Sequence, residues 1–183
     1  NIGQLDSYVF LNQVKAWGET WAPEVRMVTD DLISYVNIQG SCNAYYDGNV
    51  NYYRESNQCN ATARIADVNY HEWGHGFHYY SLEAGTWDGS VSEGLADAVS
   101  FFLTGDSVVA PYFMKNGSGI RDAAPDRVYP DDITNEVHSD GLIFAGAVWD
   151  LWSILEEEME EDAAYETVVN LFVNAIKGGP TIP

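Results

Sequence analysis

Two histidines and a glutamate in one short stretch could hold and use a metal ion. The stretch contains His71-Glu72-x-x-His75. Residues four positions apart on an α-helix lie on one face, about 5–6 Å apart at Cβ, so both imidazoles could reach one ion. Imidazole nitrogen is a good ligand for Zn²⁺. Glu72 would lie where its carboxylate can hold a water molecule beside the metal and accept its proton.

A second stretch favours a metal site over the simpler interpretation, a solvated histidine pair on a surface helix. A catalytic zinc site needs three protein ligands and one open position. Glu93 lies 18 residues after His75, which leaves room for a helix end, a loop and a second helix. Asp97, one helical turn further, could orient a ligand histidine through the ring nitrogen that does not bind the ion.

Glu93 also has a competing structural role. Ser90-x-x-Glu93 fits a capping box, in which Glu93 would cap its own helix. Ser92 or Asp88 could cap that helix instead, which would leave Glu93 free to bind a metal.

The order His71-Glu72-x-x-His75, then Glu93-x-x-x-Asp97, resembles the gluzincin metallopeptidases, the thermolysin-like and fungalysin-like enzymes. The resemblance implies an α+β, zincin-like catalytic domain of two lobes. A small mixed N-terminal sheet with the active-site helix would form one lobe, and helices would form the C-terminal lobe. It also implies a Zn²⁺ cofactor and hydrolysis of peptide bonds with Glu72 as general base.

The metzincin pattern fits this chain poorly. It needs a glycine three residues after the second histidine and a third ligand three further on, where this chain has His78 and Ser81. His78 would lie about 10 Å along the helix from His71, too far to share the metal. We interpret His78 as a surface or outer-shell histidine.

Asn43-Ala44-Tyr45-Tyr46 is similar to the edge strand with which thermolysin-like enzymes bind substrate. The resemblance implies that the Ala44 backbone pairs with the substrate next to the scissile bond. It also implies that the Asn43 side chain holds the peptide on the primed side, C-terminal to that bond. A strand edge offers unpaired N–H and C=O groups to an extended peptide. An ordinary hairpin strand is the alternative.

The stretch from Glu136 to Gly141 resembles the segment whose histidine steadies the tetrahedral intermediate in the same family. That role falls on His138, and such a donor contributes about 2.7–4 kcal/mol to catalysis. The family orients this histidine with a carboxylate. Asp132 and Glu136 are both candidates, and we favour Asp132. The family's helper tyrosine has no clear counterpart, although three aromatic residues lie nearby in sequence: Tyr79, Tyr80 and Trp87.

Composition limits the classes of partner. The chain has 8 Lys and Arg residues against 28 Asp and Glu residues, a net charge of −20. Nucleic acids and anionic membranes would be repelled by this charge. No apolar run is long enough for a membrane span. We expect a monomer that acts on peptides or proteins.

Cys42 and Cys59 lie 17 positions apart and flank the predicted hairpin. A disulfide between them would add about 3 kcal/mol of stability. It would also indicate an oxidising, secreted setting. Two free thiols are the alternative.

Periodicity and turn signals predict the elements that position these residues. Asp47-Gly48 favours a tight hairpin turn, and Asp67 is a good N-cap for the metal helix. Gly74 and Gly76 would each weaken that helix by about 1 kcal/mol, which close packing of another helix would explain. We predict helices over 6–20, 68–82, 90–104, 107–115, 142–159 and 163–177, and a strand over 32–39.

Calcium has weaker sequence support than zinc. In the family, the residue matching Asp67 can join a calcium cluster, but the other carboxylates of that cluster have no obvious counterparts. The acidic run from Glu156 to Asp162 is the other candidate, and it should also break the helix that carries it. A solvated charge run is the simpler interpretation.

We expect one catalytic domain over 1–183, with an N-terminal lobe at 1–82 and a helical lobe at 83–183. The end of the chain reads as a linker, so we expect the natural protein to continue beyond Pro183. The predicted activity is that of a zinc endopeptidase. An aminopeptidase of the same class, or a zinc-stabilised binding module without activity, are the alternatives.

Overall fold

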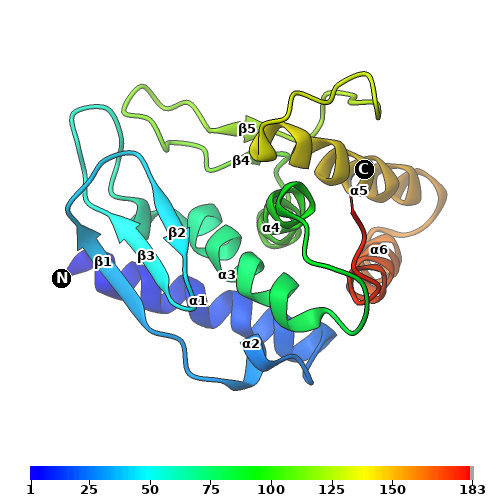
Figure 1. Ribbon diagram of the computed structural model, residues 1–183, viewed down its shortest axis with the longest axis horizontal. Coiled ribbons are helices and arrows are strands. Elements are labelled where there is room, and N and C mark those ends of the chain that lie inside the picture. Colours follow the sequence, from blue (N-terminus) through cyan, green and yellow to red (C-terminus); the bar gives the residue numbers. More distant parts are fainter. Residues whose placement is uncertain (182–183) are drawn as a thin grey trace.

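Two small sheets and six α-helices are the main elements of residues 1–181, the part of the chain described by this computed structural model (Figure 1). The predicted α+β class is confirmed. The helices are α1 (Ile2–Trp21), α2 (Arg26–Thr29), α3 (Ala66–Ser81), α4 (Gly89–Thr104), α5 (Val137–Glu158) and α6 (Glu161–Ile176), with a 3₁₀ turn at Thr62–Arg64. The strands are β1 (Ser34–Ile38), β2 (Ala44–Tyr46), β3 (Val50–Tyr53), β4 (Val108–Val109) and β5 (Arg121–Asp122).

The three-stranded sheet has the order β1-β3-β2, so β2 is an edge strand. β1 runs parallel to β3, and β2 runs antiparallel to it through the predicted hairpin. The turn suits its residues because Gly48 has a φ of +103° and Asp47 Oδ1 accepts a hydrogen bond from Asn49 N at 3.1 Å. Figure 1 shows the sheet at one end, α5 and α6 at the other, and α3 and α4 between them.

The main core joins the helices from both ends of the chain. Its buried residues include Trp17 of α1, Trp73 and Phe77 of α3, Phe101 of α4 and Phe172 of α6. A second cluster under the sheet includes Tyr52, Cys59, Val68 and Phe113. The helices α3 and α4 are therefore held from several sides.

Glycines allow α3, α4 and α5 to approach closely. A Cβ added at Gly74 would lie 2.8 Å from Ala96 Cα of α4, which confirms that this glycine packs against another helix. Gly76 is likewise close to another helix, through Met27 of α2, and also to Tyr46 of β2. A Cβ at Gly94 of α4 would collide with the carbonyl of Gly141 in α5.

Several predicted boundaries were wrong. Asp67 is not the N-cap of α3 but lies in its first turn, where Oδ1 accepts a hydrogen bond from Ala110 N at 3.0 Å. Residues 107–115 contain the short strand β4 and turns rather than a helix.

The helix α5 begins at Val137 instead of 142, because the Glu136 carboxylate accepts hydrogen bonds from the His138 and Ser139 amides. The predicted break in the acidic run is confirmed, with α5 ending at Glu158. Of the predicted C-terminal linker, residues 182–183 lie outside the described part.

His78 is fully buried, so the prediction of a surface histidine was wrong. It does not belong to the outer shell of the predicted metal site either: neither ring nitrogen has a hydrogen-bond partner. Its ring stacks against Trp87, with centroids 6.4 Å apart. Burial lowers the pKa of His78 to about 4, which keeps the imidazole neutral at pH 7.

Candidate metal centre

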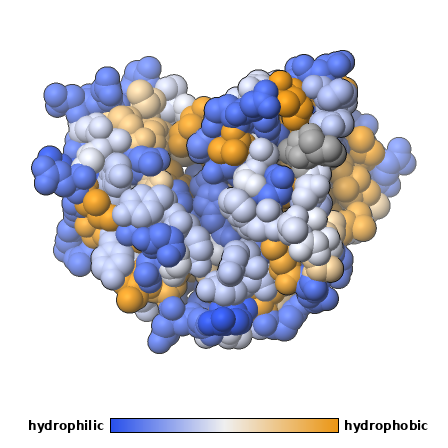
Figure 2. Space-filling model, in the orientation of Figure 1, coloured by the Kyte–Doolittle hydropathy of each residue, from blue (hydrophilic) through white to orange (hydrophobic). Residues whose placement is uncertain are grey.

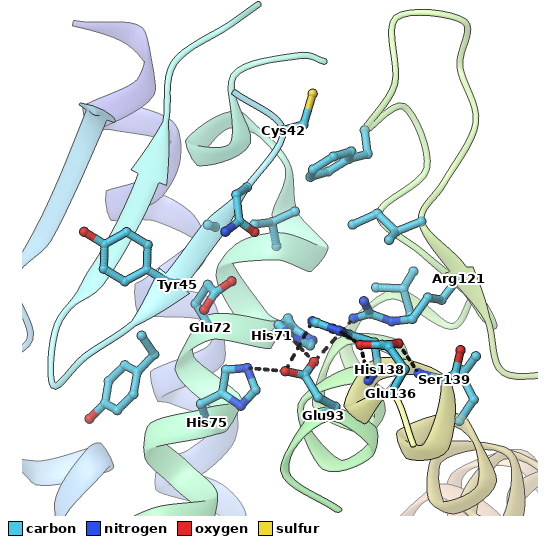
Figure 3. Close-up of a pocket in the computed structure, with 18 of the residues that line it drawn as sticks. Cys42, Tyr45, His71, Glu72, His75, Glu93, Arg121, Glu136, His138 and Ser139 are labelled. Atoms are coloured by element: carbon cyan, nitrogen blue, oxygen red, sulfur yellow. Dashed lines mark hydrogen bonds and ion pairs between the residues drawn. The ribbon is translucent and has the colours of Figure 1, made fainter. Parts of the chain in front are cut away.

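His71, His75 and Glu93 converge where α3 crosses α4. Each offers a ligand atom, and these atoms all lie within 4.8 Å of one another. Glu93 Oε2 is 3.3 Å from His71 Nε2, and Glu93 Oε1 is 3.7 Å from His75 Nε2. Within residues 1–181, this is the only such cluster of three His, Cys, Asp or Glu residues. Figure 3 shows the three side chains pointing toward one another.

The other nitrogen of each imidazole is engaged elsewhere. His71 Nδ1 lies 2.8 Å from Asp97 Oδ1, as predicted for Asp97, and His75 Nδ1 lies 2.9 Å from Ser92 Oγ. These contacts fix the ring orientations and direct both Nε2 atoms at Glu93. Two imidazole nitrogens and one carboxylate oxygen form a set of ligand atoms that suits Zn²⁺. The residues present therefore fit a zinc ion.

Asp88 explains why Glu93 is free for this role. Its carboxylate accepts a hydrogen bond from Val91 N at 2.9 Å and caps α4. Glu93 is thus not needed as a helix cap, and its two carboxylate oxygens face the two histidines of the triad.

Charge is concentrated at this point. Burial alone would lower the pKa of His71, but its hydrogen bonds with Asp97 and Glu93 outweigh burial and raise that pKa to about 10. Burial alone would raise the pKa of Glu93, but the bond to His71 and the nearby charges lower it to about 2. Carboxylates that hold a proton on His71 this firmly would also attract a divalent cation.

Glu72 lies beside the triad and remains without a partner. Its side chain is buried, and Oε2 has no hydrogen bond. Burial raises the pKa of Glu72 to about 7. A carboxylate with a pKa near neutrality can both accept and return a proton.

Arg121, on β5, was missed by the sequence analysis. Its Nε and Nη2 donate to the two Asp97 oxygens at 2.8 and 2.7 Å, and Nη2 is 3.9 Å from Glu93 Oε2. Burial alone would raise the pKa of Asp97, but the Arg121 charge holds it well below its usual range. Asp97 therefore bridges Arg121 and His71. The only sequence signal for Arg121 was that it lies in a long irregular segment. Such a segment predicts a functional loop but no particular residue.

His138 approaches the triad from the first turn of α5. Its Nε2 is 3.5 Å from Glu93 Oε1, and its Nδ1 is 2.6 Å from Glu136 Oε1. The preference for Asp132 as its partner was therefore wrong. Asp132 Oδ2 instead accepts a hydrogen bond from Val128 N at 2.7 Å. The bond with His138 lowers the pKa of Glu136 to about 2.

An open cleft of about 1290 Å³ runs past the triad. Asn43, Ala44, Arg121 and His138 are among the residues that line it. Figure 3 shows Tyr45 of β2 on one side of the cleft and Arg121 and His138 on the other. The space-filling view shows a notch between the two sides of the molecule (Figure 2). Tyr79, Tyr80 and Trp87 also line the cleft. They are candidates for a second hydrogen-bond donor to the developing oxyanion, but lining the cleft does not assign that role to any one of them.

The exposed edge of β2 faces this cleft. Asn43 O accepts a hydrogen bond from Tyr53 N at 3.2 Å, so Asn43 forms a hydrogen-bonded pair with β3. Because such pairs alternate along antiparallel strands, the N–H and C=O of Ala44 point away from β3. They are thus free to bond with another extended chain.

The predicted disulfide is confirmed. Cys42 and Cys59 are joined with an S–S distance of 2.06 Å and a Cα–Cα distance of 5.3 Å. In the described part of the chain, no helix has the length and apolar character that a membrane crossing needs.

No protein-family model and no curated protein matches the sequence. The fold is similar to a solved structure described as the precursor of protealysin, a metalloproteinase from Serratia proteamaculans. The TM-score is 0.69 at 12% sequence identity, and the match covers 96% of this chain and 78% of the other. At this identity the likeness establishes the fold: this chain has the zincin-like α+β fold of that protease precursor.

Proposed function

We propose that this chain is a zinc-dependent endopeptidase of the gluzincin type. One observation carries the proposal: two helices direct His71, His75 and Glu93 at a common point, beside the buried carboxylate of Glu72 and in an open cleft. The fold shared with a metalloproteinase precursor agrees with it.

In the proposed mechanism, His71, His75 and Glu93 hold Zn²⁺, which when bound would polarise both a water molecule and the scissile carbonyl. Glu72 accepts the proton of the attacking water and then donates it to the leaving amine. His138 Nε2 donates a hydrogen bond to the oxygen on which negative charge develops. Glu136 holds His138 in place, as the 2.6 Å contact suggests. Asp97, itself bound by Arg121, keeps His71 in the orientation that binding requires.

The substrate would bind as an additional strand on β2. The free N–H and C=O of Ala44 would pair with its backbone, and Asn43 would hold its primed side. An internal stretch of peptide can lie in such an open cleft, which supports endopeptidase action.

We further propose a secreted protein that acts as a monomer, with 1–183 as one catalytic domain. The disulfide fits an extracellular setting. The predicted lobes, 1–82 and 83–183, would fold together because the main core includes residues of both, such as Trp73 and Phe101.

The test compares wild type with Glu72→Gln. Both proteins should bind one zinc ion, because Glu72 is not a ligand. Only wild type should cleave casein and internal bonds of peptides with free or acetylated N-termini. If acetylation of the peptide N-terminus abolishes cleavage, the enzyme is an aminopeptidase rather than an endopeptidase. Bound zinc without cleavage by either protein would replace it with a binding module.

A further inference from the structure

The Cys42–Cys59 disulfide lies where two walls of the cleft meet. Cys42 immediately precedes Asn43 and Ala44 and itself lines the cleft. Figure 3 shows Cys42 at the cleft margin, on the side of the edge strand. Its partner Cys59 is fully buried and forms an isolated β-bridge with Met114. One covalent bond thus connects the substrate strand to the segment on which the opposite wall rests.

That opposite wall is the segment 109–120, called the 109–120 wall from here on. Val109, Phe113 and Ile120 of this segment line the cleft. Ile120 N donates to Val109 O at 3.0 Å, which closes the segment at its base. The wall therefore presents apolar side chains to the space beside the metal triad.

The 109–120 wall has little regular structure to hold it. Its strands at either end, β4 and β5, contain two residues each. Ala110 and Tyr112 have positive φ values of 54° and 67°, which a strand or helix would not maintain. Its position must therefore come from contacts with neighbouring elements.

Those contacts are concentrated around Cys59. Asn60 N donates to Phe113 O at 2.9 Å, and Lys115 N donates to Gln58 O at 2.8 Å. The Asn60 side chain adds a bond from Nδ2 to Tyr112 O at 2.7 Å. Phe113 packs in the same buried cluster as Cys59. The 109–120 wall is thus hydrogen-bonded to Gln58 and Asn60, the residues on either side of Cys59.

The primed side of a bound peptide would lie at this end of the cleft. An antiparallel peptide on β2 has its C-terminal part beside Asn43, the residue next to Cys42. The side chain that follows the scissile bond would then face the 109–120 wall.

We propose that the Cys42–Cys59 disulfide positions the substrate by fixing the 109–120 wall against the edge strand, and so sets selectivity for an apolar residue just after the scissile bond. This rests on the proposed function. It assigns the disulfide a task beyond stability, because loss of the bond should affect one side of the substrate and leave the metal ligands in place.

The experiment compares wild type with Cys42→Ser/Cys59→Ser on two peptides that differ only after the scissile bond, leucine against glycine. We expect kcat/KM for the leucine peptide to fall about tenfold, mainly through KM, with little change for the glycine peptide. Zinc content should be unchanged. Val168→Ala, a destabilising change in buried α6, is the control and should preserve the preference for leucine. Equal losses on both peptides, as for a merely structural bond, would overturn the proposal.

Amide hydrogen exchange gives a readout that does not require activity. Loss of the disulfide should accelerate exchange of the Asn60 and Lys115 amides, while amides within α3 keep their protection. Unchanged exchange at both amides would overturn the proposal even if wild type proves inactive. Should the double variant not fold, Asn60→Ala keeps the disulfide and removes the bond to Tyr112. It should then accelerate exchange over 112–115 and weaken the preference for leucine, and no change in either would also overturn the proposal.

Discussion

His71, His75 and Glu93 are carried by two long packed helices, whereas Arg121, Glu136 and His138 come from the segment between α4 and the first turn of α5. On the helical side, the regular spacing of residues along α3 and α4 and the core that these helices share position the three side chains. The other side, from 106 to 138, has only the two-residue strands β4 and β5 before α5 begins. The comparison teaches that the three candidate metal ligands are positioned by rigid elements. The groups expected to act on substrate are positioned by a few tertiary contacts.

The largest effect should come from the helical side. His75→Ala removes a ligand, so zinc should be lost and kcat/KM should fall about 10⁴-fold or more. His78→Phe is the matched control on the same helix, since His78 is stacked on Trp87 and neither of its ring nitrogens makes a hydrogen bond. Metal analysis and peptide cleavage check both. Retained zinc in His75→Ala would contradict the assignment of the triad.

The next effect should come from the other side of the cleft. His138→Ala should lower kcat about 10²–10³-fold, because it removes one donor to the developing oxyanion. Zinc content should not change. Glu136→Gln, which weakens the orienting contact, should cost about tenfold. Asp132→Asn is the control and should resemble wild type, because Asp132 is bonded to Val128 N. Steady-state kinetics on one peptide would test all three, and an Asp132 effect equal to that of Glu136 would count against the geometry.

Asp97 is one of the contacts between the two sides, through its hydrogen bonds with Arg121, and the effect of its substitution should be smaller. Asp97→Asn should reduce zinc affinity about 10–100-fold, because Asp97 orients His71. The same change leaves Arg121 buried without its full counter-charge, so thermal stability should fall as well. A competition titration with a chromogenic chelator measures the affinity. Unchanged affinity would mean that His71 is oriented by helix packing alone.

The smallest effect should come from Asp67, where α3 meets Ala110. Asp67→Ala leaves the buried Ala110 N–H without an acceptor and should cost about 1–2 kcal/mol in the free energy of unfolding. Asp67→Asn keeps an acceptor without a charge and should be at least as stable as wild type at pH 7. Urea titrations of the three proteins would decide.

The same residue gives a pH dependence with a definite sign. Burial raises the pKa of Asp67 above its ordinary value of 3.8. The stability of wild type relative to Asp67→Asn should therefore be greatest below 3.8 and should decline as pH rises through the folded-state pKa. A constant difference across that range would show that Asp67 is not desolvated.

Sequence reasoning succeeded where the determinants are local. The i,i+4 spacing of His71 and His75, the Asp47-Gly48 turn and the pair of cysteines each specify geometry within a short segment. Asp97 was also found because one helical turn separates it from Glu93. These features predict structure without knowledge of the remaining chain.

It failed where a partner lies far away in the chain. Asp67 was taken as a cap, but its hydrogen-bond partner is 43 residues away. Arg121 is 24 residues from Asp97, and no spacing rule connects them. His78 was misplaced because 12 of the 16 residues of α3 are buried, so this helix has no solvent face for periodicity to reveal. The preference for Asp132 over Glu136 failed for a local reason instead: α5 begins earlier than expected, and its N-cap Glu136 lies beside His138.

The glycines at the helix crossings have a consequence for how this centre can change. A single added carbon at Gly94 would strike the Gly141 carbonyl, and one at Gly74 would crowd Ala96. Either clash would push α4 aside, and Glu93 would move with it relative to the two imidazoles. The spacing between the three candidate metal ligands thus depends on Gly74 and Gly94, which are not themselves ligands. Substitutions there offer a way to alter which cation the donors accept while every donor stays in the sequence.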